Sequence, residues 1–172
     1  MSIFFCSDHH FGHDKILTFY NYNGEKTRVF DDINSMNETI IYNHNSVVKK
    51  SDEVYFLGDV AIELNSLNLL SRMNGKKKLI RGNHDIFHIS HYLKYFDEIL
   101  ATATFVGDFI LSHIPIHPNC ISKSYVSNVH GHLHSNIIKD KRYFNVSLEQ
   151  IDFTPIEYSE ILKKIKLNSV VK

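Results

Sequence analysis

The sequence predicts an α/β fold whose sheets are mixed rather than purely parallel. Short β-branched or aromatic runs alternate with segments of helical periodicity, which is the pattern of α/β domains. Polar clusters directly follow several of the strand-like runs, as expected where ligand-binding residues gather at the carboxyl edge of a sheet. Two later runs flank the tight turn Gly107-Asp108, so they should form an antiparallel hairpin.

The expected strands are short, and most are rich in β-branched and aromatic residues. They span residues 3–6, 53–57, 78–81, 99–106, 109–112, 126–130, 143–146 and 151–156.

Four segments with helical patterns lie between or after these strands. The first, residues 36–48, follows Ser35-Met36-Asn37-Glu38, which has the spacing of a capping box. The second, residues 64–73, should stop near Asn74-Gly75, because these residue types tolerate a left-handed cap. The others span residues 86–96, with Asp85 as the expected N-cap, and residues 159–166.

Length and composition indicate a single globular domain, residues 1–172. The 19 basic and 19 acidic side chains balance, which argues against strong sequence-independent affinity for nucleic acid. No apolar stretch approaches the roughly 20 residues that span a bilayer, so no membrane partner is expected. The N-terminus lacks the basic lead of a signal peptide, and Cys6 and Cys120 suggest no disulfide framework. We therefore expect a cytoplasmic protein.

Five polar clusters follow the expected strands and are rich in carboxylate and imidazole groups. Most are weak indications alone, since Gly-Asp is a common turn pair and a lone histidine is more often structural than a ligand. Gly82-Asn83-His84-Asp85 is a stronger indication, because such a string seldom arises by chance. They are Asp8-His9-His10, Gly58-Asp59, Gly82-Asn83-His84-Asp85, His113 and Gly131-His132-Leu133-His134. If the backbone stayed extended, Asp8 and His10 would point to the same side.

Taken together and in order, these clusters resemble the signature of the calcineurin-like metallophosphoesterase superfamily, in the form of a small uncapped phosphoesterase of bacterial or phage type. That resemblance implies a two-sheet sandwich flanked by helices. It also implies two bound metal ions. One would be held by Asp8, His10, Asp59 and His134, and the other by Asp59, Asn83, His113 and His132, with Asp59 bridging.

The same resemblance implies hydrolysis of a phosphodiester or phosphomonoester by a hydroxide that bridges the metals. His84 would be the catalytic residue that assists the leaving group. The donor set of carboxylate, amide and imidazole suits divalent transition metals. We favour manganese, while iron, cobalt, nickel and zinc also fit. A phosphodiesterase is favoured over a phosphomonoesterase, because no clamp for a doubly charged terminal phosphate is visible.

Three further residues are weaker candidates for contact with the substrate. His13 resembles the extra histidine of subgroups with Ser-Asp-x-His-Phe-Gly-His, and Arg28 and Arg81 could grip a phosphate. The stretches 14–50 and 114–125 should overhang the site. The substrate is expected to be a small phosphate ester, with nucleotides among the compatible ones, and a homo-oligomer is compatible with the sequence.

The sequence is also compared with three alternatives to a phosphodiesterase or phosphomonoesterase: a protein phosphatase, a non-catalytic scaffold and a regulatory or nucleic-acid-binding metal module. Protein phosphatases of the superfamily continue Gly-Asp with Asp-Arg-Gly, whereas Gly58-Asp59 continues with Val60-Ala61. A non-catalytic scaffold on the same fold is the main alternative, and the intact His84 argues against it. A regulatory or nucleic-acid-binding metal module is disfavoured by the balanced charge.

Overall fold

The computed structural model describes residues 1–122 and 124–170, and within it the chain forms two β-sheets. The first sheet has the order β4-β3-β2-β1-β9, in which β1 to β4 run parallel and β9 pairs antiparallel with β1. Its strands are β1 (Ile3–Cys6), β2 (Glu53–Phe56), β3 (Lys76–Ile80), β4 (Glu98–Leu100) and β9 (Ile156–Glu157).

The second sheet has the order β5-β6-β7-β8. The hairpin of β5 and β6 is antiparallel around Gly107-Asp108, as predicted, whereas β6, β7 and β8 are parallel. Both sheets are therefore mixed. The strands are β5 (Ala103–Val106), β6 (Phe109–Ser112), β7 (Ser127–His130) and β8 (Tyr143–Asn145).

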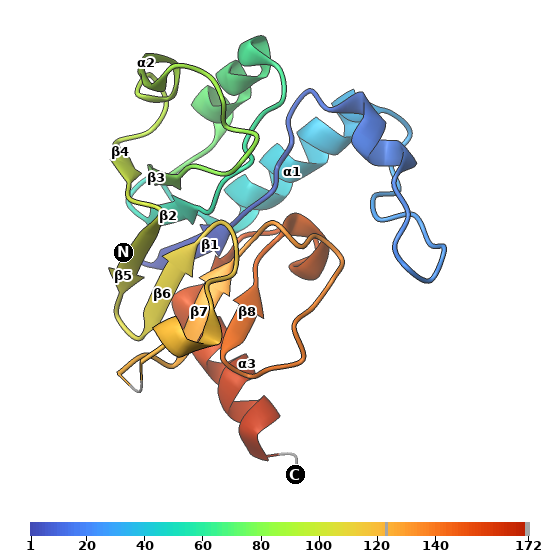
Figure 1. Ribbon diagram of the computed structural model, residues 1–172. Helices are drawn as coiled ribbons and strands as arrows, with labels where there is room; N and C mark the ends of the chain where they lie inside the picture. The colour runs from blue at the N-terminus through green and yellow to red at the C-terminus, as the bar shows by residue number, and fades with distance from the viewer. Residues whose placement is uncertain (123, 171–172) are drawn as a thin grey trace.

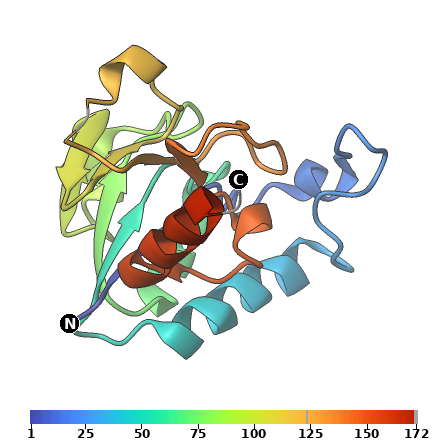
Figure 2. The same ribbon diagram turned by 90° about the horizontal axis from the view of Figure 1, so that it is seen from below.

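Alternating side chains of the first sheet bury its two faces against different partners. On one face, the Phe5 ring of β1 meets the Phe109 ring of β6, with centroids 6.0 Å apart, so this face packs on the second sheet. On the other face, the Phe56 ring of β2 lies 6.0 Å from the ring of His44 in α1 (Ile33–Val47). The predicted two-sheet α/β fold flanked by helices is confirmed (Figures 1 and 2).

Two α-helices other than α1 and four 3-10 helices complete the described chain. The second longest helix, α3 (Tyr158–Val170), lies beside the sheets, and its Tyr158 ring contacts Phe109 with centroids 4.7 Å apart (Figure 2). The remaining helices are α2 (Ile89–Tyr92), η1 (Asp14–Thr18), η2 (Leu64–Arg72), η3 (Pro118–Cys120) and η4 (Leu148–Gln150).

The helix predictions were right in place but partly wrong in detail. Helix α1 begins three residues early, because Asp32 rather than Ser35 is the N-cap and forms a reciprocal capping box with Ser35. Glu38 instead pairs with Arg72 at 2.6 Å. The segment 64–73 is a 3-10 helix, and the predicted helix 86–96 is reduced to the single turn of α2.

Two strand predictions were also wrong. The run 99–106 is not one strand, because residues 101–102 carry the chain from β4 in the first sheet to β5 in the second. The run 151–156 is mostly a turn after η4, in which Asp152 and Phe153 have positive φ angles of 48° and 54° that no strand accommodates.

Each sheet contains neighbouring parallel strands, whose carboxyl ends lie at one edge of that sheet. Strands β1, β2 and β3 run parallel in the first sheet, and β6 and β7 run parallel in the second. Loops that follow these five strands can therefore converge from two sheets. Within residues 1–122 and 124–170, no helix is both long and apolar enough to cross a membrane.

Candidate metal centre

Every one of the seven predicted ligands follows the carboxyl end of a parallel strand. They come from five loops, and the structure brings them together. Asp8 and His10 follow β1, Asp59 follows β2, Asn83 follows β3, His113 follows β6, and His132 and His134 follow β7.

These side chains form two groups with the spacing of metal sites. In the first, Asp8, His10 and His134 each present a ligand atom, and these atoms lie within 4.8 Å of one another. In the second, the same holds for Asp59, His113 and His132. A seventh predicted ligand joins the second group, because its Asn83 Oδ1 lies 2.9 Å from His113 Nε2.

Asp59 belongs to the second group and also faces the first. Its Oδ2 atom is 3.4 Å from Nε2 of His113 in the second group and 3.7 Å from Nε2 of His10 in the first. Its Oδ1 atom is turned away and accepts a hydrogen bond from the His84 amide at 2.8 Å. One carboxylate oxygen is thus fixed by the backbone, while the other faces both groups.

The backbone at these positions is strained. Asp8, His10, Asp59, His132 and His134 all have positive φ angles, between 49° and 69°. Such a conformation costs a non-glycine residue of the order of 1–3 kcal/mol and tends to occur at functional sites. The backbone from Asp8 to His10 is therefore not extended, so the condition for strand alternation between the two side chains is not met. Left-handed turns, rather than strand alternation, aim these side chains into the site.

Two glycines allow the ligand loops to approach one another closely. A Cβ atom at Gly58 would lie 2.5 Å from the Gly82 nitrogen and 2.6 Å from Nδ1 of His113. A Cβ atom at Gly131 would collide with the Ser7 hydroxyl and lie 2.5 Å from Oδ2 of Asp8. The glycine before each ligand is thus required by the packing of a neighbouring loop.

Hydrogen bonds to the scaffold orient the ligand atoms. Nδ1 of His113 lies 2.7 Å from the Leu57 carbonyl and can donate its proton there, so that Nε2, which faces Asn83 and Asp59, can bind a metal. Nδ1 of His134 lies 2.9 Å from Oε1 of Glu149, with the same result. The carboxylate of Asp8 accepts bonds at Oδ2 from the His132 amide and the Ser147 hydroxyl, at 2.9 Å and 2.8 Å.

Three buried atoms of the predicted ligands lack a hydrogen-bond partner among the described residues. Oδ1 of Asp8 and both ring nitrogens of His10 make no hydrogen bond within the described residues. Orphaned polar atoms of this kind are costly unless they coordinate an ion. Carboxylate, imidazole and amide groups suit divalent transition metals, so the residues fit two such ions.

The ionisation of these groups follows from burial and mutual contact. Burial lowers the pKa of His10 well below its ordinary value, so its ring is neutral, which is the form that binds metals. Burial raises the pKa of Asp8, since the nearby imidazoles of His134 and His113 offset only part of the desolvation. Burial would also raise the pKa of Asp59, but the hydrogen bond and charge of His113 leave it below its usual range.

His84 is the predicted catalytic residue, and it lies at the open side of the site. Its Nε2 atom is 4.0 Å from Oδ2 of Asp59, and its ring centroid is 5.5 Å from that of His10. The side chain is 51% exposed, in contrast to the buried ligands Asp8, His10, Asp59 and His113. It can therefore contact a substrate that approaches from solvent.

The three weaker candidates lie in different environments. The ring of His13 is 5.4 Å from the ring of His10, at the rim of the site. Arg28, however, is buried, and its guanidinium donates to the carbonyls of Asp8 and His9, so the prediction that it grips a phosphate is wrong. Arg81 donates to the Asp85 and Phe87 carbonyls and is thereby occupied by its own loop.

The predicted helix cap at Asp85 is also wrong. Its carboxylate accepts hydrogen bonds from the amides of Asp59, Val60 and Gly82, at 2.8–3.0 Å. Asp85 therefore ties the loop after β3 to the loop after β2 and holds Asp59 in place. This long-range role explains why no helix begins at Ile86.

Glu149 was missed by sequence reasoning. Its buried Oε1 accepts from Nε of Arg28 at 2.8 Å and from His134, so it joins a buried cation to a predicted ligand. Burial would raise the pKa of Glu149, but Arg28 and His134 lower it to about 2. The available signal was the polar pair Ser147 and Glu149 just after the expected strand 143–146.

Comparison with known proteins supports this architecture. The chain is 33% identical to the uncharacterized protein MJ1445 of Methanocaldococcus jannaschii over 187 aligned positions, which cover 99% of the chain and 94% of that protein. The chain belongs to the MJ1445 family. No model of a known protein family matches the sequence.

Two solved structures have similar folds. A protein of unknown function from Aquifex aeolicus, AQ665, has a TM-score of 0.77 and 28% identity, with 95% of the chain and 98% of AQ665 covered. An archaeal phosphodiesterase has a TM-score of 0.51 and 16% identity, with 86% of the chain and 82% of that protein covered. The second similarity concerns the fold alone, and it agrees with the two-sheet α/β architecture of the MJ1445-family chain.

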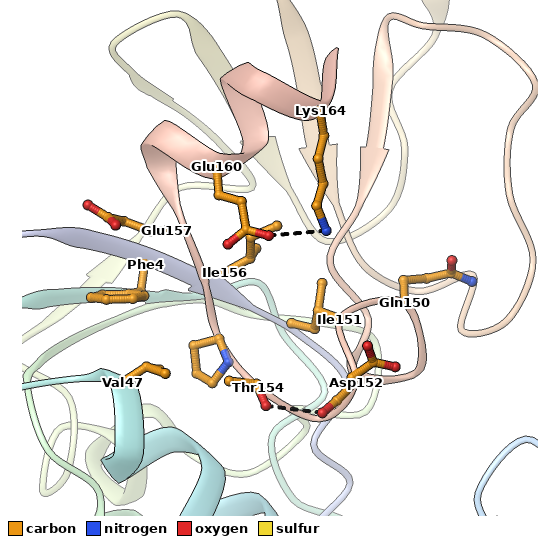
Figure 3. A pocket seen from close by; sticks show the side chains of 11 residues that line it. Phe4, Val47, Gln150, Ile151, Asp152, Thr154, Ile156, Glu157, Glu160 and Lys164 are labelled. Carbon is orange, nitrogen blue, oxygen red and sulfur yellow. Dashed lines mark hydrogen bonds and ion pairs between the residues drawn. The ribbon is translucent and has the colours of Figure 1, made fainter. Parts of the chain in front are cut away.

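A separate hollow of about 530 Å³ lies away from the ligand loops (Figure 3). It is bordered by Phe4 of β1, Val47 of α1 and charged residues of α3. There Glu160 and Lys164 pair with each other at 3.2 Å. Neither of the two ligand groups found in the described chain includes a residue of this hollow, so it is not the metal centre.

Glu149→Gln should weaken metal binding by His134. The amide keeps the shape but loses the charge that orients the imidazole, and loss of such outer partners typically costs about 10- to 100-fold in metal affinity or activity. Calorimetric metal titration of the folded variant measures this. Because Arg28 loses its ion pair, the thermal midpoint should fall as well, so the titration is run well below that midpoint.

The matched control is Glu38→Gln. Glu38 pairs with Arg72 on the surface, where its side chain is 57% exposed, and exposed pairs contribute little. This variant should bind metal like the parent protein. Equal metal affinity in Glu149→Gln and Glu38→Gln would contradict the role assigned to Glu149.

Proposed function

We propose that this protein is a metal-dependent phosphodiesterase with a binuclear centre. The observation that carries the proposal is the position of Asp59, whose single free oxygen faces both ligand groups at 3.4 Å and 3.7 Å. A carboxylate in that position can be shared by two ions. Manganese is the favoured metal, since the mixed oxygen and nitrogen donors suit it.

The residues have distinct parts in the proposed reaction. Asp8, His10, Asp59 and His134 would hold one ion, and Asp59, Asn83, His113 and His132 the other. Paired divalent ions supply positive charge for the phosphoryl oxygens and make water acidic enough to act as a nucleophile. The strained ligand loops, together with Asp85 and Glu149, hold the donor atoms in position before the substrate arrives.

His84 lies outside both ligand groups, so it can act on the leaving group. Its half-exposed ring can reach the ester oxygen that leaves, and it can donate a proton to that oxygen or stabilise its charge. Of the two arginines predicted to contact a phosphate, Arg28 is buried and Arg81 is hydrogen-bonded within its own loop, so neither is available to bind a doubly charged phosphate. This favours diesters over monoesters.

The test combines metal analysis with two chromogenic substrates. Purified protein should bind two ions per chain, lose activity on chelation and recover it with Mn²⁺. Bis(p-nitrophenyl) phosphate should be hydrolysed faster than p-nitrophenyl phosphate. Full activity with one ion per chain would contradict the binuclear centre. A strong preference for the monoester would contradict the diesterase, and metal binding without hydrolysis of any ester would favour the scaffold alternative.

A further inference from the structure

A small hairpin next to the metal centre has no part in the reaction described so far. Residues 19–27 double back, with an antiparallel bridge between Tyr20 and Lys26 and a hydrogen bond of 3.0 Å from the Thr27 amide to the Phe19 carbonyl. Asn21 closes the turn, since its side-chain oxygen accepts from the amides of Asn23 and Glu25. The hairpin is therefore formed before any ligand binds. It projects from the body of the protein (Figure 1).

This hairpin exposes aromatic rings. Phe19 is 48% exposed, Tyr20 is 61% exposed and Tyr22 is 93% exposed. The Phe19 ring contacts the ring of His13, at 5.7 Å between centroids, and His13 in turn contacts His10. A line of rings therefore leads from a predicted metal ligand to the hairpin. Clustered exposed aromatic side chains beside a site are typical of ligand contacts.

A hollow of about 260 Å³ lies between the hairpin and the metal centre. Its apolar walls are formed by Ile16, Phe19, Tyr20 and Leu133. Two predicted metal ligands, His132 and His134, form the wall nearest the reaction. A substituent on a phosphate held at the metal centre could therefore extend into this hollow.

The remaining lining is polar. Thr27, Ser135 and Asn136, which have polar side chains, border the same hollow. A purely apolar substituent, such as an acyl chain, would leave these groups without partners, at a cost in free energy. A flat ring with polar edges would satisfy both the aromatic and the polar walls.

We propose that this hollow is a subsite for a nucleoside esterified to the scissile phosphate. Stacking of a base on exposed aromatic rings is tolerant of base identity, because every base has a π-face. The inference rests on the proposed phosphodiesterase function and names its substrate class.

A second hollow, of about 510 Å³, adjoins the first and shares Ser135 and Asn136 with it. Tyr22 and Lys139 also line it, so it offers a further ring and a cation. A free nucleotide would use the first hollow alone, whereas the end of a single strand would use both. Both ligands would place a nucleoside in the first hollow, and they differ in the number of nucleotides that follow it.

Calorimetry with AMP and ribose 5-phosphate tests the subsite on metal-loaded protein. AMP is the product that an adenosine diester would leave, and ribose 5-phosphate lacks only the base. AMP should bind roughly 10- to 100-fold more tightly, in line with stacking of one base. Tyr20→Leu combined with Phe19→Leu should remove most of this difference. The control Tyr42→Leu, on the exposed face of α1, should preserve it.

Equal affinity for AMP and ribose 5-phosphate would overturn the subsite, as would an AMP preference that survives the double substitution. Hydrolysis of bis(p-nitrophenyl) phosphate tests the proposed function separately. If the protein bound AMP through Tyr20 but hydrolysed no ester, the subsite would be supported and the proposed phosphodiesterase activity would be contradicted. Thymidine 5′-phosphate and the 5′-phosphorylated thymidine dinucleotide distinguish a free nucleotide from a strand end. If the protein binds strand ends, the dinucleotide should bind more tightly than the mononucleotide, and Tyr22→Leu should remove this difference.

Discussion

Asp59→Asn should abolish metal binding by both ligand groups and reduce diester hydrolysis by at least about 10³-fold, more than the roughly 10- to 100-fold typical of an outer partner. The free oxygen of Asp59 is the only atom that lies within 4.0 Å of histidines in both groups among the described ion pairs. Asparagine keeps the size but removes the charge that two divalent ions would share. Loss of this one charge should therefore prevent metal binding by both ligand groups.

Metal content per chain and the rate on bis(p-nitrophenyl) phosphate measure this effect. The control is Asp31→Asn, an exposed carboxylate without a hydrogen bond to any described residue, which should leave both quantities unchanged. Asp8→Asn provides a useful contrast, because Asp8 belongs to one group only and should cost one ion. If Asp59→Asn kept two ions and near-normal activity, the shared carboxylate would not exist.

The ligand positions could be predicted because their signal is local. Gly82-Asn83-His84 and Gly131-His132-Leu133-His134 follow strands, and glycine before a polar residue marks a sharp turn. What sequence periodicity could not supply was the backbone conformation. Positive φ angles at Asp8 and His10 replace the extended spacing that strand alternation suggests.

The supporting network could not be predicted, because it is made of long-range contacts. Arg28 and Glu149 are 121 positions apart, and nothing near Arg28 in the sequence distinguishes a buried ion pair from a phosphate clamp. Asp85 is similar, since its position before an apolar segment is typical of a helix cap. Two of its three amide partners, Asp59 and Val60, lie on the loop after β2, and the third, Gly82, lies on its own loop.

The fold was predicted where periodicity and turns agree and missed where the chain changes sheets. The Gly107-Asp108 hairpin has a clear turn signal and was placed correctly. Between β4 and β5, however, the alternation of Ala and Thr continues without a glycine or proline, although the chain passes from one sheet to the other at residues 101–102. Tertiary packing, rather than local propensity, ends the strand there.

His84→Ala should leave metal binding intact and slow hydrolysis by roughly 10²- to 10⁴-fold, the range of general acid–base catalysis. The contacts support this separation of metal binding from rate. Nε2 of His84 lies 4.0 Å from Asp59, but the side chain is half exposed and belongs to neither ligand group. Its amide, which holds Oδ1 of Asp59, is unaffected by the substitution.

Substrates with different leaving groups distinguish two roles for His84, proton donation and charge stabilisation. An alkoxide needs a proton as it departs, whereas a nitrophenolate does not, so a proton donor at His84 should matter far more for a dialkyl or dinucleotide diester than for bis(p-nitrophenyl) phosphate. Equal losses on both kinds of ester, with both ions retained, would assign His84 to charge stabilisation of the phosphoryl oxygens instead. Loss of an ion together with activity would make it a ligand. His91→Ala, on the neighbouring helix α2, is the control and should behave like the parent protein on both esters, because His91 lies outside both ligand groups.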